Sequence, residues 1–122
     1  MNIPFLIAGS LTTLAALAHS IGGEMTTIRS LASAELKEVP KLELRAGWYM
    51  IAAHLFASAI MLFILAFNAN GDIVMGRFLA IQFFGYGLAF LGLAIVRPVG
   101  LLQAPQWVLF FLMAGLTYWG TI

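Results

Sequence analysis

Long apolar stretches alternate with shorter polar links along this chain of 122 residues. The apolar stretches cover residues 3–21, 46–67, 77–96 and 105–121, and most of their positions are Leu, Ile, Phe, Ala or Gly. A helix needs about 20 apolar residues to cross a bilayer, so each stretch is a candidate span and the fourth is the shortest. The pattern predicts an all-α fold, an antiparallel four-helix bundle in a membrane, built as one domain over residues 1–122.

The polar links carry the signals that start and stop helices. Asn2 can cap the first helix, and Pro4 suits its first turn. Most of the charged residues lie in the link 22–45, where Pro40 is expected to end any helix. The part of this link at 25–36 either extends the first helix or lies on the membrane surface. The other two links are rich in Asn, Gly or Pro and are predicted to be turns, at residues 68–72 and 97–100.

Composition separates this chain from soluble proteins. Hydrophobic residues make up 62% of it and charged residues 9%, whereas soluble domains are about 25% charged. The net charge of +1 provides no basic surface for nucleic acid, and the absence of cysteine excludes disulfides and thiolate chemistry. With no phosphate-binding Gly-rich loop and no nucleophile–base pair in the sequence, we expect a protein that is not an enzyme by itself.

The first apolar stretch also resembles a signal peptide in one respect. Ala16-Leu17-Ala18 has the small residues of a cleavage site. The five residues at the start contain no Lys or Arg, which a signal peptide would carry there. We therefore interpret the stretch as a first membrane helix.

The basic residues predict the orientation in the membrane. Basic residues accumulate on the cytoplasmic side of membrane proteins. Arg77 is the only basic residue expected on one side of the membrane, and all the others are expected on the opposite side. The links 22–45 and 97–105 are therefore predicted to be cytoplasmic and both termini periplasmic, in a bacterial inner membrane. The basic residues on the predicted cytoplasmic side are Arg29, Lys37, Lys41, Arg45 and Arg97.

Small residues recur at helical spacing in every apolar stretch, and small residues let membrane helices approach closely. We therefore expect these stripes to face the bundle interior, together with the polar residues that they contain. The stripes are Ala8, Thr12, Ala16 and His19; Gly47, His54 and Ser58; Gln82, Gly85, Ala89 and Gly92; and Ala114 with Gly115.

The two histidines are the leading candidates for chemistry, because ionisable side chains inside a membrane are rare and costly. Helical side chains tilt toward the N-terminus, so His19 and His54 on adjacent antiparallel helices would tilt toward each other. The pair could hold a metal ion with Glu24, ligate a haem, bind a quinone head group or relay protons. The simplest alternative is that each histidine only makes an interhelical hydrogen bond.

Other polar residues extend the candidate site. Glu24 either pairs with Arg45 or Arg97 in a cytoplasmic vestibule or is a solvated acid at the interface. The two arginines form a predicted interfacial charge cluster that anchors the helix ends. Gln82 and Tyr86, one turn apart, either line a polar pocket with His54 or bond a neighbouring helix.

Two motifs resemble those of an uncharacterised family of small four-helix bacterial integral membrane proteins. They are His19-Ser20-Ile21-Gly22-Gly23-Glu24, near the end of the first helix, and Arg45-Ala46-Gly47-Trp48, at the start of the second. In that family a histidine commonly follows the tryptophan, whereas Tyr49 follows it here. The resemblance covers about the first half of the chain and implies the fold without an activity. Small multidrug-resistance transporters share the length, but their acidic residue in the first helix is absent here.

These observations favour an accessory or interaction subunit of a larger membrane complex, or a binder of a hydrophobic small molecule. The alternatives are a transporter or channel component with a histidine-lined path, and a bis-histidine haem or quinone protein. The expected partners are the lipid bilayer and either a larger complex or a second copy of the chain, with no nucleic acid. No cofactor is the leading expectation, with haem or quinone as the alternatives.

Overall fold

The computed structural model describes residues 1–68, 70–96 and 100–122, and these ranges contain helices and no strand. The first helical segment runs from Ile3 to Ser33, and three further helices follow it. The all-α prediction is therefore confirmed. The elements are α1 (Ile3–Leu17), η1 (Ala18–Gly22), η2 (Glu24–Ile28), α2 (Arg29–Ser33), α3 (Glu38–Phe67), α4 (Ile73–Val96) and α5 (Gln106–Trp119).

The first helical segment is α-helical at both ends and π-helical in the middle. The side-chain oxygen of Asn2 accepts a hydrogen bond from the backbone N–H of Phe5 at 3.2 Å, as expected for its N-cap. The turns η1 and η2 then carry the segment beyond the predicted end at residue 21 and into α2. Residues 25–33 therefore extend the first helix instead of forming a separate surface element.

Two helices begin earlier than the apolar pattern predicts. Helix α3 begins at Glu38, and Pro40 lies in its first turn instead of ending a helix. Proline is tolerated there because the first N–H groups of a helix have no intrahelical partner. Helix α4 begins at Ile73 because the carboxylate of Asp72 accepts hydrogen bonds from the N–H groups of Val74 and Met75, at 2.8 and 3.3 Å.

Three helical segments are long and apolar enough to cross a membrane: Ile3–Ser33, Glu38–Phe67 and Ile73–Val96. The fourth, α5, has 14 residues and is about 21 Å long at 1.5 Å per residue. That length is shorter than the roughly 30 Å hydrocarbon core of a bilayer. Helix α5 packs along α4, which is long enough to cross that distance.

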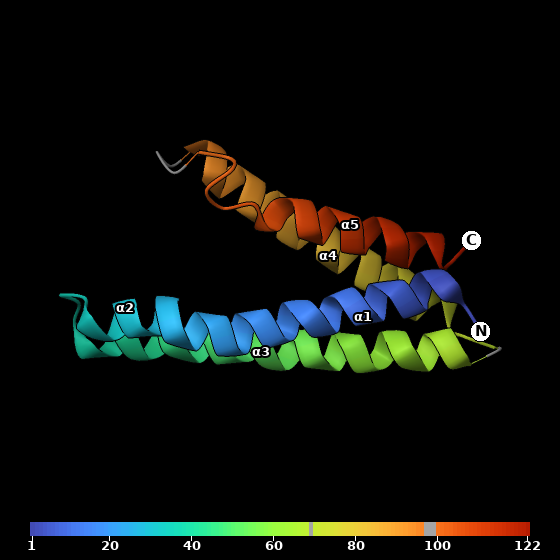
Figure 1. The fold of residues 1–122 in the computed structure, drawn as a ribbon, viewed down its shortest axis with the longest axis horizontal. Coiled ribbons are helices and arrows are strands. Elements are labelled where there is room, and N and C mark those ends of the chain that lie inside the picture. Colours follow the sequence, from blue (N-terminus) through green and yellow to red (C-terminus); the bar gives the residue numbers. More distant parts are fainter. Residues whose placement is uncertain (69, 97–99) are drawn as a thin grey trace.

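The helices form two hairpins that meet at one end of the molecule and diverge toward the other (Figure 1). One hairpin pairs the first helical segment with α3, and the other pairs α4 with α5. Both termini and the link between α3 and α4 lie at the end where the hairpins meet (Figure 1). Helix α2 lies at the opposite end, where the hairpins are farthest apart.

The aromatic side chain of Phe5 packs between the hairpins where they meet. Phe5 of α1 is buried, and its ring lies where Cβ atoms at Gly76 and Gly120 would otherwise be. Asn2 adds two hydrogen bonds there, from its backbone N–H to the Ala66 carbonyl at 2.7 Å and from its side-chain amide to the Gly120 carbonyl at 2.8 Å. Phe5 and Asn2 thus connect α1 to the ends of α3, α4 and α5.

The predicted inward stripes are only partly correct. Ala8, Thr12 and Ala16 are buried on α1, whereas Gly85, Ala89 and Gly92 are exposed on α4. Helix α4 buries a different face, which also carries small residues, so small-residue spacing alone could not choose between the two faces. The buried residues of α4 are Gly76, Leu79, Ala80, Phe83, Gly87 and Ala94.

Replacing Phe5 by alanine should weaken the junction of the hairpins. We expect Phe5→Ala to lower the free energy of unfolding by about 3–5 kcal/mol, because removing the ring leaves a void between the glycines and its dispersion contacts are lost. Unfolding in lipid bicelles measures this change. Phe78→Ala, at an α4 position whose side chain is 57% exposed, is the matched control and should cost far less. Equal losses in the two variants would contradict the role given to Phe5.

Candidate functional site

His19 binds the first helical segment to α3 through its partner Trp48. The imidazole and indole rings are stacked, with centroids 3.9 Å apart and planes 15° from parallel. Nε2 of His19 donates a hydrogen bond to the backbone carbonyl of Trp48 at 3.0 Å. The indole N–H of Trp48 is buried and has no hydrogen-bond partner among the described residues. The contact therefore consists of ring stacking and one interhelical hydrogen bond. Such a hydrogen bond was the simplest of the alternatives considered for His19.

Gly23 makes this stack possible. It is buried, and a Cβ added to it would overlap the indole ring of Trp48. Its neighbour Gly22 has no atoms within 4 Å of such a Cβ. Of the two consecutive glycines, only the second is therefore required by the packing of α3.

The π-helical turns direct both His19 and Glu24 toward the same neighbouring helix, α3. At about 100° per residue, residues five apart on an α-helix point about 140° away from each other. A π-helical turn bonds residue i to residue i+5 and brings such residues closer in direction. His19 contacts Trp48, and Glu24 contacts the next residue of α3, Tyr49. The π-helical region thus brings an imidazole and a carboxylate into contact with adjacent residues of α3.

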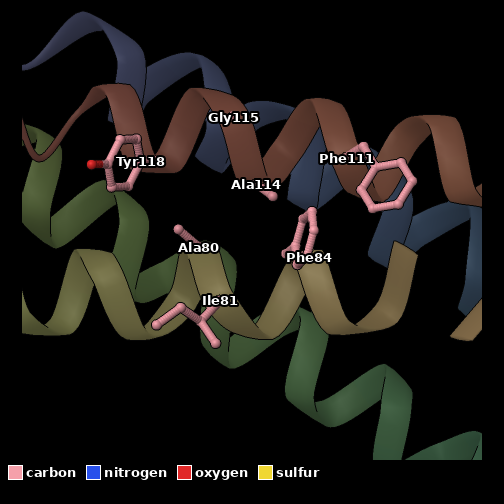
Figure 2. Close-up of a pocket in the computed structure, with 7 residues that line it drawn as sticks. All are labelled: Ala80, Ile81, Phe84, Phe111, Ala114, Gly115 and Tyr118. Carbon is pink, nitrogen blue, oxygen red and sulfur yellow. The ribbon is translucent and has the colours of Figure 1, made fainter. Parts of the chain in front are cut away.

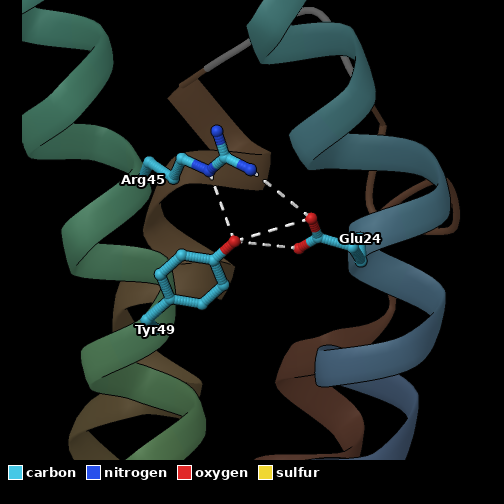
Figure 3. Close-up of polar contacts among 3 residues, drawn as sticks. All are labelled: Glu24, Arg45 and Tyr49. Carbon is cyan, nitrogen blue, oxygen red and sulfur yellow. Dashed lines mark hydrogen bonds and ion pairs between the residues drawn. The ribbon is translucent and has the colours of Figure 1, made fainter.

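Glu24, Tyr49 and Arg45 form a polar cluster near the α2 end of the molecule (Figure 3). The Tyr49 hydroxyl donates to Oε2 of Glu24 at 3.2 Å and accepts a hydrogen bond from Nε of Arg45 at 3.3 Å. Nη2 of Arg45 lies 3.6 Å from Oε1 of Glu24, and both side chains are about half exposed, at 50% and 47%. Glu24 is therefore paired with Arg45, one of its two predicted partners, and the cytoplasmic vestibule around this pair stays a prediction. Arg97, the other predicted partner, lies outside the described residues.

His54 belongs to a second polar cluster, between α3 and α4. Its Nε2 lies 3.1 Å from the Ser58 hydroxyl, one turn along the same helix, and its ring meets Tyr86 edge to face at 5.8 Å. The side-chain amide of Gln82 donates to the Tyr86 hydroxyl at 3.4 Å, whereas its oxygen is buried without a partner among the described residues. Gln82, Tyr86 and His54 thus lie close together, whereas the polar pocket that they were expected to line stays a prediction.

The two histidines have different partners and different surroundings. His19 bonds to α3 through Trp48, whereas His54 bonds within its own helix and packs against α4. Within the described ranges, no group of three or more His, Asp or Glu side chains could hold a metal ion. This placement offers no common site for a ligand that both imidazoles would hold.

A cavity of about 640 Å³ lies between the hairpins, in the region where they diverge. His19 and Trp48 line it from the first hairpin, whereas Phe90 and Phe110 line it from the second. Its wall is mostly apolar, and the few polar side chains come from η1, η2 and the start of α5. The other lining residues are Ala15, Ala18, Gly22, Gly23, Thr26, Thr27, Ile51, Leu55, Gln106 and Leu109.

A second hollow, of about 480 Å³, follows the outer side of α4 and α5 (Figure 2). Small residues at Ala80, Ala114 and Gly115 leave the space, and the rings of Phe84 and Phe111 close one end of it. Tyr118 provides the one polar side chain in its lining. This groove has the apolar character of a lipid-facing surface.

Trp48 and Tyr49 are members of the site that the sequence did not reveal. Trp48 drew notice only as the end of the Arg45-Ala46-Gly47-Trp48 motif, and Tyr49 only as a departure from that motif's usual pattern. One signal was available for Tyr49, because Arg45 and Tyr49 are four residues apart and share a helix face. Recognising Trp48 would have required knowing that Gly23 packs against it.

The difference between Gly22 and Gly23 can be tested directly. We expect Gly23→Ala to displace Trp48 and to lower the free energy of unfolding by about 1–3 kcal/mol, which is the usual cost of overpacking. The adjacent variant Gly22→Ala should leave stability unchanged or raise it slightly. Thermal unfolding and the tryptophan emission spectrum in detergent measure both effects. Equal destabilisation by the two substitutions would contradict the packing described for Trp48.

Comparison with models of known protein families, with curated proteins and with solved structures gives no match to this chain. Its function is therefore inferred from its own residues and their geometry.

Proposed function

We propose that this protein lies in the inner membrane of a bacterium and binds a hydrophobic small molecule between its two helix hairpins. The observation that carries the proposal is the cavity of about 640 Å³ lined by the His19–Trp48 stack. Small-molecule sites typically measure about 300–1,000 Å³ and combine an apolar wall with a few polar groups. The cavity meets both criteria.

The polar groups are distributed unevenly along this cavity. His19, Thr26, Thr27 and Gln106 belong to the elements nearer the α2 end, whereas Leu55 and Phe110 lie farther along the helices toward the junction. A molecule with a polar head and an apolar body would match this gradient. Burial from lipid yields little hydrophobic free energy, so shape and the few hydrogen bonds would set the selectivity.

The charge distribution supports the proposed orientation. Arg29, Lys37, Lys41 and Arg45 lie in α2, α3 or the turn between them, whereas Arg77 lies near the start of α4. By the positive-inside rule, the α2 end faces the cytoplasm and the termini face the periplasm. The polar part of the cavity then lies toward the cytoplasmic surface.

The alternatives receive less support from the geometry. A transport path lined by both histidines and Gln82 would need these residues along one cavity, but only His19 belongs to the cavity wall. A bis-histidine haem likewise needs both imidazoles at one ligand. A quinone head group needs only one hydrogen-bonding side chain and stays compatible with His19.

A second candidate function is assembly into a larger membrane complex, as an accessory subunit or with another copy of the chain. One observation favours it: Gly85, Ala89 and Gly92 form an exposed stripe on α4, and Cβ atoms at the two glycines would meet nothing within 4 Å. Such stripes allow close packing of a further membrane helix. Co-purification after mild solubilisation, compared between the native chain and a Gly85→Leu, Gly92→Leu variant, tests this function.

Filling the cavity should abolish ligand binding. Ala18 lines the cavity and is exposed, so Ala18→Trp is expected to occupy the space without disturbing the buried core. Ala53→Trp, at an exposed α3 position outside the cavity wall, is the matched control. Mass spectrometry of organic extracts should find about one apolar molecule per chain in the native protein and the control, and little in Ala18→Trp. Equal content in all three samples would contradict the proposed site.

The proposed orientation predicts the behaviour of reporter fusions. A phosphatase that is active only in the periplasm should be active when fused after Ile122. The same phosphatase should be inactive when inserted into the turn at residues 34–37, because the basic residues hold that turn in the cytoplasm. The reverse pattern of activity would overturn the orientation.

A further inference from the structure

We propose that the ligand of the cavity is uncharged and carries a ring hydroxyl, as a long-chain phenol or hydroquinone does, and that this hydroxyl donates a hydrogen bond to Nδ1 of His19. The inference rests on the proposed function, because it names the chemical class that the same cavity would accept. It follows from the tautomer of His19, the charge of the cavity wall and the placement of the aromatic rings.

The tautomer of His19 follows from its partner. A backbone carbonyl can only accept a hydrogen bond, so the Nε2 atom that lies 3.0 Å from the Trp48 carbonyl oxygen must carry a hydrogen. In the neutral imidazole the other nitrogen, Nδ1, then has a lone pair and acts as an acceptor. The structure gives Nδ1 no hydrogen-bond partner within the described ranges. A ligand that meets His19 through this nitrogen must therefore supply a donor.

The cavity wall makes an anionic ligand unfavourable. Its described lining contains no Lys, Arg, Asp or Glu, and His19 is its one ionisable side chain. Arg45, three residues before Trp48 on α3, does not line the cavity and is paired with Glu24 and Tyr49. A carboxylate or phosphate head would thus be desolvated without a permanent counter-charge, which is costly. A neutral hydroxyl avoids this cost.

The hydroxyl of Thr26, in the cavity wall, already donates a hydrogen bond within its own helix. Thr26 donates its hydrogen to the Gly22 carbonyl at 2.9 Å, so its oxygen is left only as an acceptor. Gln106, on the opposite hairpin, lines the cavity and carries an amide that can donate to the ligand's oxygen. A hydroxyl group, which both donates and accepts, matches this combination.

The aromatic residues favour a flat head group. The stacked rings of His19 and Trp48 belong to the first hairpin, and the stacked rings of Phe90 and Phe110, 5.7 Å apart and 18° from parallel, belong to the second. All four residues line the cavity. A ring placed between the two pairs would gain offset or edge contacts with aromatic neighbours. A phenol combines such a ring with the required donor.

A matched pair of probes tests the inference on the intact chain. The native cavity is titrated in lipid nanodiscs with a long-chain 4-alkylphenol, with its methyl ether and with a fatty acid of equal length. Trp48 emission reports binding in a Trp107→Phe, Trp119→Phe background. We expect the phenol to bind about three- to tenfold more tightly than the ether, because the ether lacks the hydrogen that Nδ1 accepts. The fatty acid should bind more weakly than the phenol.

A variant tests whether His19 causes the preference for the phenol over the ether. His19→Phe keeps a flat ring beside Trp48 but removes Nδ1, so the phenol and the ether should bind with nearly equal affinity. His54→Phe, which removes the histidine outside the cavity wall, should keep the full preference. Far-UV circular dichroism establishes that each variant retains its helices, and the comparison of phenol with ether needs no change in the cavity wall.

The outcomes separate this inference from the proposed function. Equal affinities for the phenol and the ether in the native chain would overturn the role of Nδ1, and tighter binding of the fatty acid would overturn the uncharged head. In both cases binding that Ala18→Trp blocks would still support the cavity as the ligand site. Failure of all three probes to bind would count against both the inference and the proposed function.

Discussion

The ring of Phe5 fills the space that Gly76 and Gly120 leave open, and this contact belongs to the buried core that joins the two hairpins. Asn2 strengthens it by bonding to the backbone at the ends of α3 and α5. Because the two hairpins are joined at this end, their relative angle determines how much space lies between them at the other. The cavity is the result, and its wall is formed by residues of both hairpins.

The far end of the first hairpin is organised by a departure from α-helical geometry. The π-helical turns direct His19 and Glu24 toward neighbouring residues of α3, and Gly23 admits the indole of Trp48 between the helices. As a consequence, one nitrogen of His19 bonds to the Trp48 carbonyl, and the other has no hydrogen-bond partner among the described residues. A single histidine thus holds two helices together and also lines the cavity between the hairpins.

Much of the architecture follows from the sequence, because length and apolar composition are enough to locate membrane helices. The Asn2 cap and the pairing of Gln82 with Tyr86, one turn apart on one helix, were also predictable from local spacing. The early start of α4 could have been found from Asp72, a good capping residue that the apolar pattern ignored. The first turn of α3 was missed because Pro40 can begin a helix as well as end one.

The remaining features depend on contacts between distant residues. Nothing local distinguishes the buried small-residue face of α4 from the exposed one at Gly85, Ala89 and Gly92, because α5 decides which face is covered. The π-helical turns and the packing of Phe5 between two glycines likewise depend on partners far along the chain. The expected meeting of His19 and His54 rested on axial height and tilt, whereas their actual partners depend on the rotation of each helix.

The hairpins are held together at the terminal end and separated at the other. Because the chain contains no cysteine, pairs of spin labels can be attached at introduced cysteines, and double electron–electron resonance in nanodiscs measures the distance between them. One pair, at Met25 and Leu102, spans the divergent end, and the other, at Ile3 and Ile122, spans the terminal end; all four positions are exposed. We predict a clearly longer distance for the first pair than for the second. Similar short distances at both ends would mean that the hairpins pack along their whole length, and would contradict the cavity on which the proposed function depends.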